Sequence, residues 1–187
     1  MARAITRTRS PTRLQSTTPG VESLSVLQEL EKKIIWLSTW TIHHANNVRE
    51  SRDGLKVGGH QASSTSLSTV MTALYLGGVL QPHDRVAVKP HASPILHAIR
   101  YLLGQQPLEQ LQKFRSFKGC QSYPSITKDH PGAGVDFSTG SVGLGAATST
   151  FAALFQDYLQ LKGLPPASSL KSAAAGGSAG REGASKP

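Results

Sequence analysis

Three short stretches rich in glycine, histidine and serine constrain this chain most, because each stands before a segment with a helix-forming pattern. They cover residues 54–63, 86–93 and 136–145. In the first stretch, His60 follows two glycines, which let a ligand approach the backbone closely. In the second, His91 follows a Val-Ala-Val run, and ligands of open α/β sheets bind where strands give way to helices. The pattern predicts an anion-binding pocket built from loops.

The remaining sequence is mainly of helical character. Apolar residues recur at three- and four-residue steps through residues 22–50, which predicts one long helix. A short strand is expected at residues 85–89, where Val86 and Val88 alternate, and a long irregular loop at residues 116–140. Further helices are expected at residues 64–76, 93–103, 108–114 and 143–161, with Ser93 as an N-cap.

The predicted fold class is α/β, but incomplete. One strand cannot form a parallel sheet, since each strand needs neighbours that satisfy its backbone groups. We therefore expect part of a parallel sheet with helices, helix-rich as it stands, at residues 21–163. Residues 1–20 are expected to form a basic disordered tail, and residues 164–187 a low-complexity disordered tail.

The net charge of +9 lies mostly at the two ends of the chain. Residues 20–159 contain 12 basic and 10 acidic residues, whereas a nucleic-acid reader needs basic residues gathered on a folded face. No apolar run approaches the roughly 20 residues that span a membrane. Neither nucleic acid nor membrane is therefore an expected partner. The single cysteine, Cys120, excludes an internal disulfide and fits a cytoplasmic location, or a mitochondrial one if residues 1–20 act as a transit peptide.

Each of these signals alone also allows a simpler interpretation. A single histidine in a loop is more often a surface or capping residue. The glycines at positions 140, 143 and 145 resemble a dinucleotide-binding fingerprint, but no clear strand precedes them and no acidic residue follows about 20 residues later. A dinucleotide-binding domain is therefore rejected.

The order of the stretches resembles that of the thiamine-diphosphate enzymes transketolase and homodimeric pyruvate dehydrogenase E1 component, over residues 54–159. Gly59-His60-Gln61-Ala62-Ser63 resembles the family's Gly-His-x-x-Ser, and Pro90-His91-Ala92-Ser93 resembles its Gly-His-x-Ser. Residues 137–145 resemble its glycine-rich stretch, and Ser122-Tyr123-Pro124 the Ser-Tyr-Pro turn of the E1 branch. The resemblance is nearer to E1, although Lys89-Pro90 departs from the E1 pattern before the second histidine.

This resemblance implies a site for thiamine diphosphate with Mg²⁺. It implies catalytic roles for His60 and His91 beside the diphosphate and the thiazolium ring, because histidines that titrate near neutrality can shuttle protons. The substrate would be a 2-oxo acid or a ketose phosphate, and the partner a second copy of the chain or a full-length homologue. The implied cofactor-binding residues are His60, Ser63, His91, Gly140, Val142 and Gly143.

The family continues into a Gly-Asp-Gly motif and a later Asn, whose oxygens hold the Mg²⁺. After residue 136 the only acidic residues here are Asp157 and Glu182, so no metal ligand is assigned. We therefore expect a truncated E1-like or transketolase-like segment that is inactive alone, or one half of a split enzyme. Two alternatives stay open: a non-catalytic module that binds a full-length homologue, and a helical protein whose motifs are coincidental.

Overall fold

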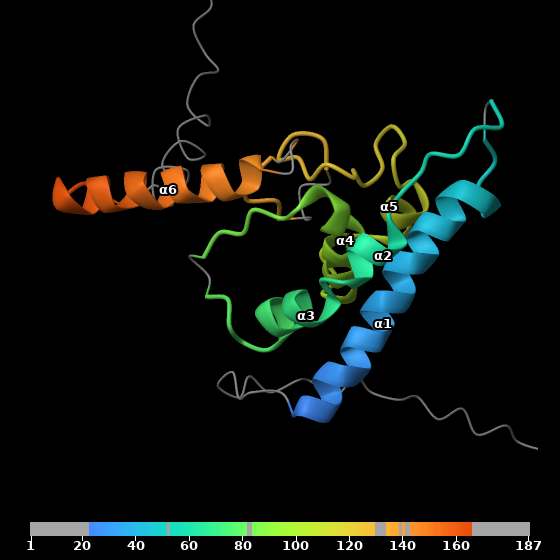
Figure 1. Cartoon of the computed structure of the whole chain (residues 1–187), viewed down its shortest axis with the longest axis horizontal. Helices are drawn as coiled ribbons and strands as arrows, with labels where there is room; N and C mark the ends of the chain where they lie inside the picture. The colour runs from blue at the N-terminus through green and yellow to red at the C-terminus, as the bar shows by residue number, and fades with distance from the viewer. Residues whose placement is uncertain are drawn as a thin grey trace, which may run out of the picture.

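The computed structural model describes residues 23–51, 53–81, 84–129, 134–138, 140 and 143–165. The tail expected at residues 1–20, most of the tail expected at residues 164–187, and Val142 lie outside these residues. All regular structure in the described part is helical (Figure 1). The elements are α1 (Leu24–His43), η1 (His44–Val48), α2 (Gln61–Thr65), α3 (Ser68–Leu76), η2 (Pro90–Ala92), α4 (Ser93–Leu102), α5 (Leu108–Gln112) and α6 (Leu144–Leu161).

Helix α4 forms the centre of the main core. Its residues 93–99 are all buried, and it packs against α1 and α3. Ile95 and Ile99 are completely buried and join Ile34 of α1 and Met71 of α3 in one apolar cluster. Burying one such side chain stabilises a fold by about 1.5–3 kcal/mol, so this cluster supplies much of the free energy that fixes α4. The turn that carries His91 is thereby anchored to the core.

A second apolar cluster fixes the end of α1 against α5. It contains Ile42, Leu111, Phe114 and the buried Cys120. After α1 the backbone widens into the π-helical turn η1, and Arg49 follows it. The Arg49 Nη1 atom donates to the carbonyl oxygens of Gln112, at 3.2 Å, and Phe114, at 2.8 Å. The loop after residue 49 therefore starts from a fixed position.

The strand predicted at residues 85–89 is wrong. The structure assigns no strand to any described residue, so the helix-rich part of the predicted fold class is confirmed and the α/β part is not. The Val86 N–H donates at 3.0 Å to the carboxylate of Asp136, and the Arg85 guanidinium lies 3.7 Å from the same carboxylate. This extended segment is therefore held by a side chain where a sheet would supply a neighbouring strand.

The helix predicted at residues 64–76 is interrupted, and its first turn begins earlier. The Thr65 hydroxyl donates to the carbonyls of Gln61 and Ala62, and the Ser66 hydroxyl donates to the carbonyl of Ser63. Such bonds give the backbone an alternative to continuous helix, and the chain breaks between α2 and α3.

The predicted N-cap at Ser93 is also wrong. Ala92 takes the cap position, and Ser93 is the first residue of α4 with no capping hydrogen bond from its side chain. The 3₁₀ turn η2 runs directly into α4 and continues the chain in helical geometry, so the side-chain cap is not needed.

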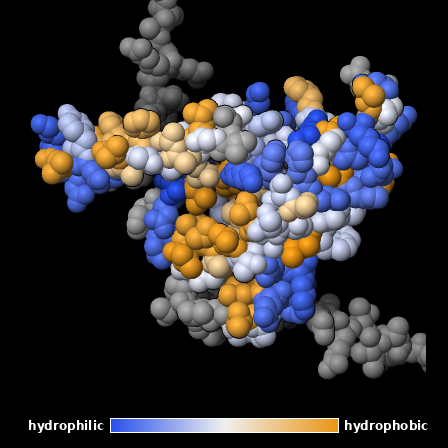
Figure 2. All heavy atoms as spheres, viewed as in Figure 1, coloured by the Kyte–Doolittle hydropathy of each residue, from blue (hydrophilic) through white to orange (hydrophobic). Residues whose placement is uncertain are grey.

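Helix α6 projects from the helical body, with its C-terminal end pointing away (Figure 1). Its exposed apolar residues recur at three- and four-residue steps and make one face of the helix, visible as orange and pale side chains in Figure 2. This face comprises Phe151, Leu154, Phe155, Tyr158 and Leu161, of which Leu161 is 86% exposed. None of the helices in the described part combines the length and the apolar character needed to cross a bilayer.

Candidate functional site

The two predicted histidines lie against one another. His60 stands immediately before α2, and His91 lies in the turn η2, which α2 contacts. Their ring centroids are 4.2 Å apart, and the ring planes are tilted by 44°. His60 is exposed and His91 is half-buried. The fold thus brings together two imidazoles from separate stretches of the sequence.

The surroundings of His91 disfavour its charged form. Partial burial lowers the pKa of His91 below its ordinary value of 6.5, and the neighbouring His60, Lys89 and Arg115 lower it further. A neutral imidazole can accept a proton at neutral pH. The geometry therefore provides a candidate proton acceptor at the surface, inside a positively charged neighbourhood.

The glycine before His60 is required by the close approach of its loop to α1. Gly59 has a φ of +136°, and a Cβ atom there would lie 2.9 Å from Cγ2 of Ile42. Both the backbone angle and the missing space disfavour a larger residue. Gly59 therefore lets the chain reach His60 while it passes directly over the buried end of α1.

Sequence reasoning missed two residues that contact this loop. Asn46, from η1, bonds to the backbone of Gly58, and Arg115, just after α5, donates to the carbonyl of Val57. Nothing in the local pattern links either residue to a loop far away in the sequence.

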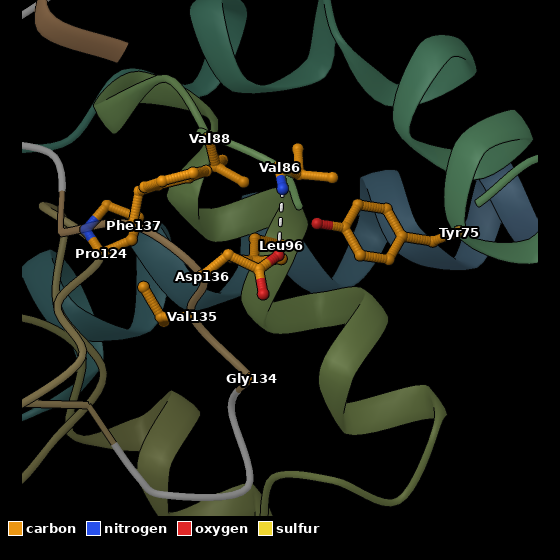
Figure 3. Close-up of a pocket in the computed structure, with 9 residues that line it drawn as sticks. All are labelled: Tyr75, Val86, Val88, Leu96, Pro124, Gly134, Val135, Asp136 and Phe137. Carbon is orange, nitrogen blue, oxygen red and sulfur yellow. Dashed lines mark hydrogen bonds between the residues drawn. The ribbon is translucent and has the colours of Figure 1, made fainter. Parts of the chain in front are cut away.

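The third stretch is joined to the second. Figure 3 shows Asp136 accepting from the backbone of Val86, with Phe137 on the side of Val88. These side chains, with Tyr75, Leu96 and Pro124 among others, line a small space that has no room for a ligand. The three stretches therefore lie next to one another in the order of the sequence. The ring contact of His60 and His91 joins residues 54–63 to residues 86–93, and Asp136 joins residues 86–93 to residues 136–145.

The predicted glycine residues that the structure describes stand in open space. Gly140 and Gly143 are exposed, and a Cβ atom at either position would meet nothing within 4 Å. Gly145, at the start of α6, approaches the second stretch, since a Cβ there would lie 3.7 Å from Cβ of Ala87. Val142, the third residue of the predicted set, lies outside the described residues.

Serine hydroxyls lie close to the histidines along the chain. Ser63, the predicted diphosphate residue, is half-buried in α2. The buried hydroxyl oxygens of Ser64 and Ser93 have no hydrogen-bond partner among the described residues. Buried polar groups are normally satisfied, so these two are unusual. The described residues contain no group of three His, Cys, Asp or Glu side chains that could hold a metal ion.

A groove of about 550 Å³ runs along α1 beside the histidine site. Trp36 and Trp40 stack in it with centroids 6.2 Å apart, and Trp36 is 63% exposed. Gln61, the residue after His60, closes the groove by donating to the carbonyl of Thr39 at 3.3 Å. The groove and the histidine site therefore share the start of α2.

Comparison with known proteins gives one consistent family. The chain is 33% identical over 167 residues to the pyruvate dehydrogenase E1 component of Mycobacterium tuberculosis, which covers 82% of this chain and 17% of that protein. It is 31% identical to the same component of Cupriavidus necator, over 77% of this chain and 16% of that protein. It is 30% identical to that of Escherichia coli K12, over 82% of this chain and 17% of that protein.

The matched region is a small part of each relative, since the chain spans 17% of the length of the first curated relatives it matches. No protein-family model matches the chain, and no solved structure gives a significant match. The curated matches nevertheless agree in name and in extent, and they bear out the resemblance seen in the glycine and histidine stretches. Over the region that they share, this chain is related to the pyruvate dehydrogenase E1 component.

Proposed function

We propose that the His60–His91 site is part of a thiamine-diphosphate site of the E1 type, serving the decarboxylation of a 2-oxo acid. The observation that carries this proposal is the 4.2 Å approach of the two rings, in a chain related to E1 components. The resemblance to transketolase also allows a second reaction, ketol transfer, with a ketose phosphate as substrate. The nearer likeness to E1 favours a 2-oxo acid over a ketose phosphate as substrate.

The residues of the site suit an anionic cofactor. Lys89 and Arg115 stand near enough to His91 to disfavour its protonation, and a diphosphate group would compensate this positive charge. The unpartnered hydroxyls of Ser64 and Ser93 are further hydrogen-bonding groups close by in the sequence. We assign the diphosphate to His60, His91 and Ser63. No Mg²⁺ ligands are assigned to the described residues.

The chemistry proposed for this chain's own residues is proton transfer and orientation. When bound, thiamine diphosphate supplies the electron sink that decarboxylation of a 2-oxo acid needs. His91, whose pKa is lowered by partial burial and by neighbouring cations, would accept a proton as a neutral imidazole. His60, which is exposed, would orient the bound cofactor from the solvent side of the site. A positioned acid or base contributes roughly 10²–10⁴-fold to a rate.

The proposal is tested by isothermal titration of the chain with thiamine diphosphate and Mg²⁺. We expect a dissociation constant on the order of micromolar, about −8 kcal/mol, that is lost in the His60→Ala/His91→Ala double variant. The matched control is His43→Ala, which removes an exposed histidine of α1 from outside the site. A folded chain that binds no thiamine diphosphate would contradict the proposal.

A second candidate function is binding to another protein chain, either a second copy or a longer homologue. The exposed apolar face of α6 favours it, because contiguous apolar faces on soluble proteins mark interaction sites. We expect Phe155→Glu to reduce any self-association seen by sedimentation and to leave thiamine-diphosphate binding unchanged. Sedimentation as a monomer, with no binding to a purified E1 component, would reject this candidate.

A further inference from the structure

The loop that carries His60 is held from both sides by polar side chains of other elements. On one side, the amide of Asn46 makes two bonds to the same residue. Its Oδ1 accepts from the Gly58 N–H at 2.8 Å, and its Nδ2 donates to the Gly58 carbonyl at 3.0 Å. The Nδ2 atom also donates at 2.7 Å to the carbonyl of Ile42. Asn46 therefore ties the loop directly to the end of α1.

On the other side, Arg115 reaches the loop from the turn after α5. Its Nη1 atom donates to the carbonyl of Val57, and a Cβ atom on Gly58 would lie only 3.0 Å from the same nitrogen. The Arg115 backbone is itself constrained, with a φ of +58° and its N–H donating at 2.9 Å to the carbonyl of Cys120. The backbone of Arg115 is therefore held beside the second apolar cluster, and its guanidinium reaches from there to the loop.

Geometry and charge place Arg115 beside both histidines. It donates a hydrogen bond to the carbonyl of Val57, three residues before His60, and its positive charge lowers the pKa of His91. The other titratable groups that act on His91 are His60 and Lys89. Arg115 thus both holds the loop before His60 and contributes positive charge beside His91.

We propose that Asn46 and Arg115 are positioning residues that clamp Val57 and Gly58 so that the His60 ring packs on His91. This inference deepens the proposed function, because it concerns the same two histidines. The clamp requires that Gly58 and Gly59 bend tightly, and both have a positive φ. Without the clamp, we expect the loop and the exposed His60 ring to sample other positions.

The test uses NMR of the ligand-free full chain with labelled histidine, so that it does not depend on cofactor binding. Two readouts are followed: the ring-to-ring NOE between His60 and His91, and the pKa of His91. Asn46→Ala and Arg115→Ala should each lose the NOE. Arg115→Ala should also raise the His91 pKa, because a nearby cation is removed, and Arg115→Lys should restore the lower pKa.

The matched control is Asn47→Ala. Asn47 is the neighbouring asparagine, but its described hydrogen bonds go to His43 on the exposed side and not to the loop. If an alanine variant does not fold, Asn46→Asp and Arg115→Gln are measured in the same way, since each keeps part of the polar contact. An unchanged NOE in folded clamp variants, or an equal loss of the NOE in Asn47→Ala, would overturn the inference. Failure of the parent chain to bind thiamine diphosphate would count against the proposed function alone.

Discussion

His91 and His97 stand six residues apart in the sequence, yet the fold gives them opposite environments. His97 is completely buried, with Nδ1 at 3.1 Å from Oε1 of Gln106 and Nε2 at 2.8 Å from the carbonyl of Gln121. His91 is half-buried against His60, and neither of those two rings has a hydrogen-bond partner among the described residues. The comparison shows that residue type alone does not identify a site: both ring nitrogens of His97 face hydrogen-bond partners in the interior, whereas the ring of His91 lies half-buried against His60.

Asp129 belongs to the same buried polar network as His97. Its carboxylate accepts from the backbone N–H groups of Gln121 and Ser125, both at 2.8 Å, and lies 3.9 Å from Nε2 of His97. This network joins α4 to the irregular loop at residues 119–129. It therefore serves to position the backbone, whereas the nitrogens of His60 and His91 have no hydrogen-bond partner among the residues that the structure describes.

The sharpest test of the comparison is removal of the buried ring. His97→Ala should lower the free energy of unfolding by about 3–5 kcal/mol, because it opens a cavity and leaves buried polar groups unpaired. His60→Ala should change it by less than about 1 kcal/mol, because the ring is exposed. Urea denaturation followed by circular dichroism measures both. Equal losses in the two variants would remove the distinction between a structural and an available histidine.

A smaller loss is expected from Asp129→Asn. The amide keeps one acceptor oxygen but places an N–H₂ group against a backbone donor, at a cost of about 2 kcal/mol. The buried thiol of Cys120 gives a second measurement. Burial raises the pKa of Cys120, so it should react with a thiol reagent only when the network opens, and faster in the variant. An unchanged rate at unchanged stability would show that Asp129 does not hold the loop.

The surroundings of the surface histidines are tested by substitution of Gly59, which precedes His60. Gly59→Ala should cost about 2 kcal/mol, because the φ of +136° is strained for alanine and the new Cβ would meet the stiff side chain of Ile42. Gly54→Ala is the matched control, since its φ is +74° and nothing lies within 4 Å of the added Cβ. We expect about 1 kcal/mol there. Thermal unfolding compares the two, and a larger loss at Gly54 would contradict the close approach to α1.

The smallest effect is the contribution of His91 to stability at low pH. Its pKa is lowered in the fold, so the unfolded chain binds the proton more readily. This contribution is therefore present above the ordinary pKa of 6.5 and is lost as the pH falls through the lower folded value. An NMR titration of the His91 ring should give a midpoint below 6.5, and His60→Ala should move it upward. A midpoint above 6.5 would mean that the neighbouring charges do not act as described.

Much of the helical framework follows from local pattern. The apolar repeat at residues 22–50 predicted α1, although the chain leaves the helix at residue 48 through a π-helical turn. Glycines stand where two of the helices end, since Gly77 directly follows α3 and Gly104 lies two residues after α4. The strand expected at residues 85–89 could not be judged locally, because a strand is defined by its neighbour and the described residues provide none.

The sequence by itself determined that His60 and His91 belong to one group of motifs, because glycine, histidine and serine recur there in the order of the E1 family. It also indicated most of the helices through their apolar spacing, although the segment at residues 64–76 breaks between α2 and α3. Only the tertiary structure decided which histidines are available and which residues hold them. Asn46, Arg115 and His97 acquire their roles from contacts with residues far away in the chain, and such contacts depend on how the helices pack, which no local pattern encodes.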